Sequence, residues 1–311
     1  MKVNFGFARA LGLASCFALF LSASNRAPLD VLVTIPDLAD ITREIGGDRV
    51  KVTSITRGRE NLHMVAAKPS HLVAMNKADM FVQIGLSLET GFVPGLMETA
   101  GNAKIRPGGK GFVNVSEGWK ALDVPASLSR QYGDLHPQGN PHMNLSPRGG
   151  EQMAERIHAA LCSNDPEAKS AFDARYEDYR GRLKSAAEKW KAMGEGWRGR
   201  KVVVYHQEYN YLADAYGIEI VGNVEERPGI PPTPNHVAAL VEQMKKDKVE
   251  VILTAIWSNN RQVEEIAAST GARVAELPNQ CGGLPGTDTW IGMMDVLHQR
   301  VADAFGAAAP R

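Results

Sequence analysis

Two series of strand-like segments, separated by one long helical stretch, most constrain the fold of this chain. The first series lies at residues 29–34, 50–55 and 80–84, and the second at 201–205, 218–221, 249–253 and 273–277. Short apolar and β-branched segments that alternate with helix-like segments are typical of α/β domains with mostly parallel strands. The sequence therefore predicts two lobes, each a mostly parallel sheet flanked by helices.

The stretch between the two series predicts helix throughout. Residues from Gly149 to about Lys191 are rich in Ala, Glu, Lys and Arg, with apolar residues at helical spacing. Pro166, preceded by Asn164 and Asp165, predicts a short helix followed by a long one. A rigid helical linker leaves a cleft between the lobes, and ligands of parallel sheets bind at the carboxyl ends of the strands. The predicted division is a signal peptide at 1–24, an N-terminal lobe at 25–148, a linker helix at 149–194 and a C-terminal lobe at 195–311.

The N-terminus predicts export. Lys2 and Arg9 precede an apolar run at 10–21, which small residues follow at 22–24. This order is typical of a cleaved signal peptide, and the run is too short to span a bilayer. A short buried helix is the less favoured interpretation. We therefore expect a periplasmic protein.

After cleavage the chain would retain two cysteines, Cys162 and Cys281. An even number in an oxidising compartment is compatible with a disulfide, but two separate thiols fit equally well.

The charge of the chain is balanced, with 35 basic and 35 acidic residues. It therefore provides no general attraction for nucleic acid or for an anionic membrane surface, and we expect a monomer.

Three of the eight histidines lie in segments that the predicted fold places beside the cleft. His63 follows the strand that ends near Ile55, His142 lies in a turn-rich segment before the linker helix, and His206 directly follows the strand at 202–205. Imidazole is the commonest protein ligand for zinc. Together these residues predict a site for a divalent metal, with Zn²⁺ the leading candidate and Mn²⁺ less favoured because it prefers oxygen ligands.

The other histidines are assigned lesser roles. We expect four of them to be surface or packing residues of helices: His71, His158, His236 and His298. His136 lies in a loop with Asp134, and these two residues could pass metal toward the main site. A separate periplasmic donor protein is the alternative way of loading.

Four motifs, in order, resemble the metal-specific solute-binding proteins of ABC importers, the zinc and manganese class called cluster A-I. They are His63 with Pro69-Ser70, Asn140-Pro141-His142 with Pro147, His206 with Tyr209, Tyr211 and Tyr216-Gly217, and the segment 225–232. The resemblance covers essentially the whole mature chain. It implies that His63, His142 and His206 bind the metal and that the protein delivers it to a cognate permease in the inner membrane.

The family usually supplies a fourth, acidic ligand, and at the matching position this chain has Asn279. A neutral amide is a poorer zinc ligand than a carboxylate. The fourth position is therefore open between Asn279, Glu276, Cys281 and water.

Two other functions compete with transport. Three histidines and a water also describe the catalytic zinc of a hydrolase, for which Glu208 is the candidate base, although we expect this side chain to face solvent or cap a helix. A metal-binding surface adhesin is the second alternative.

Overall fold

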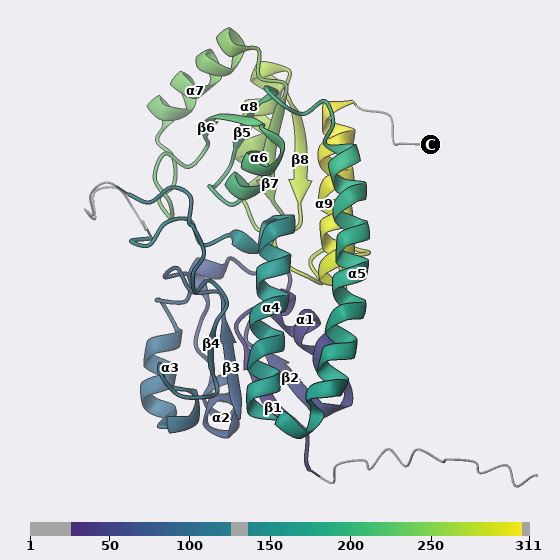
Figure 1. The fold of residues 1–311 in the computed structure, drawn as a ribbon. Coiled ribbons are helices and arrows are strands. Elements are labelled where there is room, and N and C mark those ends of the chain that lie inside the picture. The colour runs from purple at the N-terminus through teal and green to yellow at the C-terminus, as the bar shows by residue number, and fades with distance from the viewer. Residues whose placement is uncertain (1–25, 126–135, 307–311) are drawn as a thin grey trace, which may run out of the picture.

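The computed structural model describes residues 26–125 and 136–306, and two four-stranded sheets form its framework (Figure 1). The first sheet consists of β1 (Leu29–Val33), β2 (Val50–Ser54), β3 (Met80–Gln83) and β4 (Phe112–Asn114). The second consists of β5 (Lys201–Val204), β6 (Glu219–Asn223), β7 (Val251–Ala255) and β8 (Arg273–Leu277). All strand pairs within these sheets are parallel. The predicted fold class is confirmed.

The first sheet has the strand order β2-β1-β3-β4 and carries helices on both faces. Its helices are α1 (Pro36–Gly46), α2 (Pro69–Lys77) and α3 (Val93–Ala100). Successive side chains of a strand point to opposite faces. On β1, Val31 packs in one cluster with Leu38 of α1, whereas Leu32 packs in another with Met75 of α2 and Leu96 of α3.

The second sheet repeats this design with the order β6-β5-β7-β8. Its helices are α6 (Asn210–Tyr216), α7 (Pro234–Asp247), α8 (Asn260–Thr270) and α9 (Trp290–Phe305). On β5, Val203 packs with Leu240 of α7 and Ile266 of α8, whereas Val204 packs in the cluster that contains Leu297 of α9. Strands β1 and β5 are therefore buried on both faces, which explains their apolar runs at 31–33 and 202–204.

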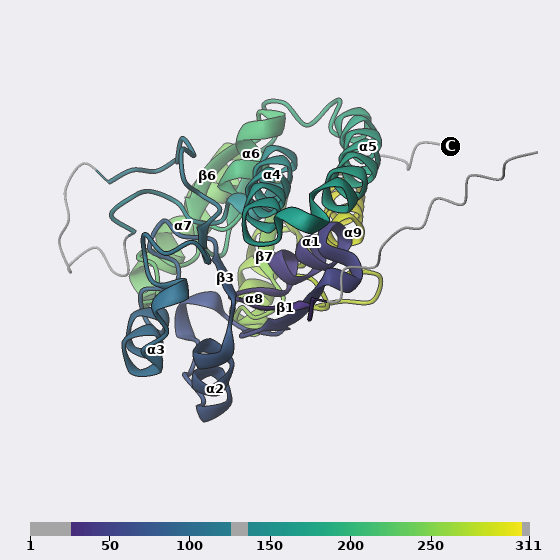
Figure 2. The same ribbon diagram turned by 60° about the horizontal axis from the view of Figure 1, so that its bottom comes forward.

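The linker helix is interrupted at Pro166, as predicted, and its two parts fold back on each other as a hairpin, which the sequence did not predict. A short helix α4 (Pro147–Asn164) leads through a 3₁₀ turn (Pro166–Ala168) into a longer helix α5 (Lys169–Met193). The Ser146 hydroxyl caps α4 by accepting a hydrogen bond from the backbone N–H of Gly149. Helix α5 packs against α1 of the first lobe and α9 of the second, and it runs along one side of the molecule (Figures 1 and 2).

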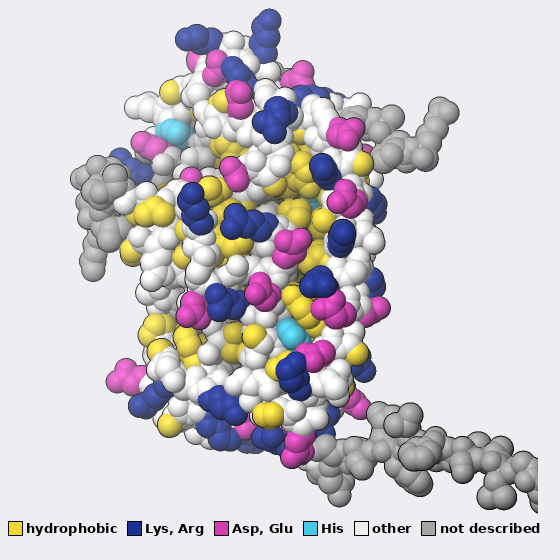
Figure 3. All heavy atoms as spheres, viewed as in Figure 1, with side chains coloured by type: hydrophobic (Ala, Val, Ile, Leu, Met, Phe, Trp, Pro, Cys, Tyr) yellow, Lys and Arg dark blue, Asp and Glu magenta, His cyan; other side chains and the backbone are white. Residues whose placement is uncertain are grey.

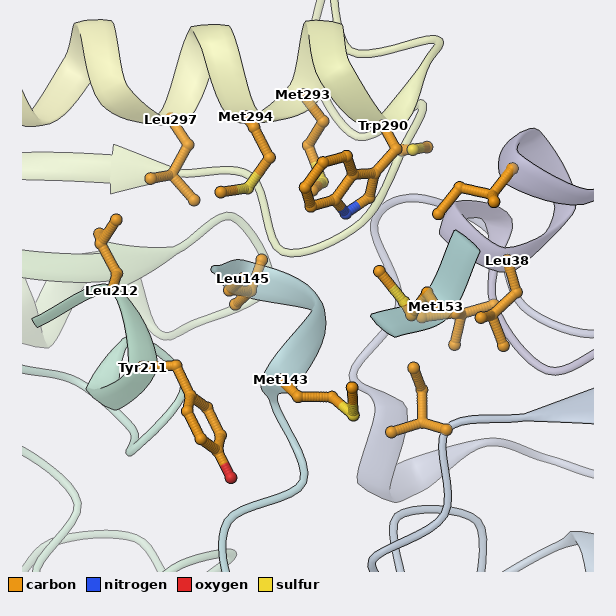
Figure 4. Packing of buried hydrophobic residues seen from close by; sticks show 14 of the residues in the cluster. Leu38, Met143, Leu145, Met153, Tyr211, Leu212, Trp290, Met293, Met294 and Leu297 are labelled. Atoms are coloured by element: carbon orange, nitrogen blue, oxygen red, sulfur yellow. The ribbon is translucent and has the colours of Figure 1, made fainter. Parts of the chain in front are cut away.

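One apolar cluster joins the lobes. It contains residues of both sheets, and Met143 and Leu145, from a 3₁₀ turn (Met143–Leu145), lie among them below α9 (Figure 4). Trp290 of α9 also donates a hydrogen bond from Nε1 to the Asn144 carbonyl, at 3.0 Å. Opening the lobes widely would expose this cluster to water. The packing therefore favours loop movement over hinge motion during ligand binding.

Several sequence predictions have other outcomes. Strand β4 was not predicted, because three residues carry too little apolar pattern. Of the two alternatives left open for Cys162 and Cys281, the structure has two separate thiols. Cys162 is half-buried on α4, whereas Cys281 is buried with its backbone N–H bonded to Asp37. The predicted signal peptide and Asp134 lie outside the described residues. The lobe boundaries stay a prediction.

Within the described ranges, no helix has the length and apolar character needed to cross a membrane.

Candidate metal centre

His63 reaches the centre from the first lobe. It lies in a 3₁₀ turn (Leu62–Met64) beyond the loop that leaves β2. The Asn61 side chain begins this turn by accepting a hydrogen bond from the His63 backbone N–H at 2.9 Å. The imidazole is half-buried.

His142 lies where the chain passes from the first lobe to the linker. Its backbone N–H donates to Asn140 Oδ1 at 3.0 Å, and Asn140 Nδ2 donates to the carbonyl of Gln207 in the second lobe at 2.7 Å. His142 is only 2% exposed. Asn140, the first residue of the Asn-Pro-His motif, thus ties this histidine to the segment that follows His206.

His206 directly follows β5, at the carboxyl end of the second sheet. Its Nδ1 lies 2.8 Å from Oε2 of Glu225, which follows β6, and both side chains are buried. Because a carboxylate accepts hydrogen bonds, Nδ1 carries the hydrogen and Nε2 is left with its lone pair. Metal-binding histidines are commonly oriented by a carboxylate in this way.

The three imidazoles converge. One nitrogen from each of His63, His142 and His206 can be chosen so that all three lie within 4.8 Å of one another. Nε2 of His63 is 3.3 Å from Nε2 of His142. Tetrahedral zinc with Zn–N bonds of about 2.0–2.1 Å requires nitrogens roughly 3.4 Å apart. The donor set therefore fits a zinc ion after small side-chain adjustments.

The surroundings keep two of these rings neutral. Burial holds the pKa of His63 well below its usual value of 6.5, and the charges of His206 and His136 lower it further. The pKa of His142 is also well below 6.5, because of burial and then the neighbouring imidazoles. Neutral imidazole is the form that binds metals.

His136 lies beside this group, although its place in the sequence predicts only an auxiliary role. Its ring centroid is 5.0 Å from that of His63. It lines, together with His142, His206 and Pro228, a small cavity of about 30 Å³ between the lobes. Its position in a loop one motif upstream of His142 was the only sequence signal for this role.

The suggested fourth ligands lie in different environments. Asn279 is 2% exposed, and within the described structure neither its Oδ1 nor its Nδ2 has a hydrogen-bond partner. Glu276 instead accepts a hydrogen bond from Asn260 and pairs with Arg300. Cys281 is buried beside Asp37. Burial and the nearby Asp37 carboxylate raise the pKa of the Cys281 thiol well above 9. Asn279 is therefore the member of this set whose polar atoms are free to take a ligand.

Glu208 does not face solvent and does not cap a helix, so the expectation for this residue was wrong. It is 1% exposed and accepts a hydrogen bond from Trp257 Nε1 at 2.7 Å. Burial raises its pKa to about 7. Trp257, which donates this hydrogen bond, lies 49 positions further along the chain, so local sequence gave no sign of the contact.

Comparisons with known proteins identify a family and relatives that carry metals. The family described as periplasmic zinc-uptake complex component A (ZnuA) matches residues 31–304. The manganese ABC transporter substrate-binding lipoprotein PsaA of Streptococcus anginosus is 24% identical over 266 residues, which cover 85% of this chain and 84% of the relative. The zinc-binding lipoprotein AdcA of Streptococcus pneumoniae (strain ATCC BAA-255 / R6) is 27% identical over 297 residues, which cover 91% of this chain and 57% of that protein.

A crystal structure of ZnuA shares the fold. It superposes with a TM-score of 0.75 at 22% sequence identity, over 89% of this chain and 98% of that chain. The family match extends from β1 to α9. The chain therefore belongs to the ZnuA family, the metal-binding solute-binding proteins of ABC importers.

Proposed function

We propose that His63, His142 and His206 bind Zn²⁺ as cargo, which the protein delivers to a permease in the inner membrane. The observation that carries this proposal is the convergence of the three imidazoles, from segments up to 143 positions apart, to within 4.8 Å. Burying three imidazoles together without a common ligand is unfavourable, because their polar nitrogens lose contact with water. A metal ion compensates for that cost.

Zinc fits the donor set better than manganese. Neutral nitrogen donors suit zinc, whereas manganese prefers carboxylate, carbonyl and water oxygens. The zinc-binding relative AdcA is similar over 91% of this chain. The manganese transporter PsaA is similar over 85%, so overall likeness does not discriminate between the metals and the donor set must.

For the fourth position we propose His136 or Asn279. His136 supplies an imidazole nitrogen from a loop, and its ring already contacts that of His63. Asn279 supplies an amide oxygen that has no other partner in the described structure. The variants His136→Ala and Asn279→Ala distinguish the two, because only loss of the true ligand weakens zinc binding.

The cavity favours binding over catalysis. Its volume of about 30 Å³, against the ~10–15 Å³ needed for one water, is the size expected for an ion with one or two waters. We therefore propose that the chain is not a hydrolase, in spite of the raised pKa of Glu208.

We further propose that it is exported with cleavage near residue 24 and acts as a periplasmic monomer rather than as a surface adhesin. A separate donor protein would load it if the 133–142 loop does not.

Metal analysis tests this function. The mature protein is stripped of metal, dialysed against buffered Zn²⁺ and compared with its His63→Ala, His142→Ala and His206→Ala variants. We expect the unaltered protein to retain zinc. Loss of a residue that only supports a ligand lowers metal affinity ~10–100-fold, and each of these variants should lose more than that. His236→Ala, at a histidine in the first turn of α7, is the matched control and should bind zinc normally. Equal binding by all four variants would contradict the proposal.

A further inference from the structure

A second group of metal-ligating side chains lies on the linker, in the part of the structure away from the cleft. His158 and Cys162 belong to α4, and Asp173 belongs to α5. His158 Nε2 is 2.9 Å from Asp173 Oδ1 and 3.3 Å from Cys162 Sγ, and Cys162 Sγ is 3.8 Å from the same carboxylate oxygen. All three ligand atoms therefore face a common point.

The helical hairpin builds this group. Residues four positions apart lie on the same face of a helix, so His158 and Cys162 are neighbours on successive turns of α4. The turn at Pro166–Ala168 brings α5 back along α4 and places Asp173 opposite them. Tyr176 stacks on the His158 ring, with centroids 4.3 Å apart and planes 5° apart, and this contact restricts the orientation of the imidazole.

We propose that His158, Cys162 and Asp173 form a second site for a zinc-class divalent cation, with water as the fourth ligand. Zn–N and Zn–O bonds of about 2.0–2.2 Å and a Zn–S bond of about 2.3 Å imply separations of roughly 3.3–3.7 Å between tetrahedral donors. The three observed separations, 2.9, 3.3 and 3.8 Å, bracket that range. To bind an ion, Nε2 of His158 and Oδ1 of Asp173 would need to move apart by about half an ångström.

The surrounding contacts leave these atoms able to bind. Lys169 donates to Oδ2 of Asp173 at 2.6 Å, so Oδ1 is the oxygen that faces the histidine and the thiol. The side chains of His158 and Asp173 are 19% and 41% exposed, so ions reach them directly from solvent. The face formed by α4 and α5 carries acidic and basic side chains intermixed with hydrophobic ones, so it has no single charge that would repel a cation (Figure 3).

This site differs in chemistry from the one in the cleft. A thiolate and an imidazole select zinc or cadmium and disfavour manganese. The linker site would consequently take zinc whichever metal the cleft carries. All three of its ligands are partly exposed, which makes it suited to rapid exchange, whereas His142 and His206 of the main site are buried.

Cobalt substitution tests the site on the full mature chain, kept reduced and loaded with Co²⁺ after removal of other metals. Cobalt bound to a thiolate absorbs strongly in the near ultraviolet, whereas cobalt bound to imidazoles alone does not. We expect this absorption in the unaltered protein and in His142→Ala, whose cleft site is disabled. Cys162→Ser should abolish it, and Asp173→Asn should shift the titration to higher cobalt concentrations. Zinc bound at saturation should fall from two ions per chain to one in Cys162→Ser.

Controls separate this site from the cleft. Cys281→Ser removes the other thiol of the mature chain and should leave the absorption unchanged, and circular dichroism checks that both serine variants remain folded. Absence of the band in the unaltered protein, or its loss in Cys281→Ser but not in Cys162→Ser, would overturn the inference. Because His142→Ala breaks only the cleft site, failure of the linker site and failure of the proposed transport function give different results.

Discussion

The two halves of the metal centre are built differently. In the C-terminal lobe, His206 follows β5 directly, is buried and is held by the carboxylate of Glu225. In the N-terminal lobe, His63 lies on a single 3₁₀ turn at the end of a loop, is half-buried and has a backbone contact with Asn61. A residue at a strand end inherits the rigidity of the sheet, whereas a loop residue depends on the contacts of its loop.

The contacts that hold the His63 loop come largely from the opposite lobe. Gln280 accepts a hydrogen bond from the Thr56 hydroxyl at 2.8 Å and donates one to the Glu60 carbonyl at 2.8 Å. Gly58 packs against the backbone of the segment 281–283. The C-terminal lobe therefore carries a preformed half of the centre and also positions the other half. We infer that metal capture and release move the His63 loop more than His206.

Loss of the Glu225 carboxylate should have the largest effect among the supporting residues. Without it, the tautomer and orientation of His206 are no longer defined, and loss of such a partner costs about 10–100-fold in metal affinity. Competitive zinc titration of Glu225→Ala measures this change, with Glu225→Gln expected to recover part of the loss because an amide oxygen still accepts the hydrogen bond. The exposed neighbour provides the control, Glu226→Ala, which should bind normally. Unchanged affinity in Glu225→Ala would mean that the C-terminal half is not organised by this pair.

Displacing the His63 loop should have an intermediate effect. A Cβ at Gly58 would clash with the backbone nitrogen of Gly283 and the carbonyl of Cys281. Overpacking of this kind costs about 1–3 kcal/mol, and relief by movement of the loop would lower zinc affinity by about 10-fold.

The matched control for Gly58→Ala is Gly95→Ala, in α3, where a Cβ would meet no atom within 4 Å. Zinc titration and thermal unfolding are measured for both variants. If Gly58→Ala destabilises the protein without weakening zinc binding, the loop does not position His63.

Removing the hydrogen bonds that hold the His63 loop should have the smallest effect on zinc binding. Gln280→Ala removes two hydrogen bonds across the lobes, each contributing about 0.5–1.5 kcal/mol. Only part of this loss reaches the metal, so we expect about a 3- to 10-fold faster release of zinc and little change in its association rate. Stopped-flow transfer of zinc to a chelator measures both rates. An equal change in both rates would indicate that the loop is not the part that opens.

Much of the fold was predictable because the information is local. Strands β1 and β5 contain apolar runs at 31–33 and 202–204, and Pro166 marks the break between the two linker helices. Strand β4 was missed because its three residues form a strand only through pairing with β3. The positions of His63 and His206 beyond strand ends, and of His142 before the linker, predicted their convergence, since ligands of parallel sheets bind at the carboxyl ends of the strands and the linker leaves a cleft between the two lobes.

The rest of the site depends on contacts between distant segments. The pairing of Glu225 with His206, the burial of Glu208 under Trp257 and the place of His136 beside His63 are set by tertiary packing. The same holds for the linker group. His158 and Cys162 have the spacing of helical neighbours, but Asp173 joins them only because the hairpin turns at Pro166, and the sequence analysis treated His158 as a surface or packing residue.

A crystal structure of the zinc-loaded protein, with anomalous diffraction recorded at the zinc edge, tests the central claim most directly. The account predicts a peak in the cleft within bonding distance of Nε2 of His63, His142 and His206, with Nδ1 of His206 still bonded to Glu225. A protein that binds zinc but shows no cleft peak, or shows one that leaves any of these three imidazoles unbound, would contradict it.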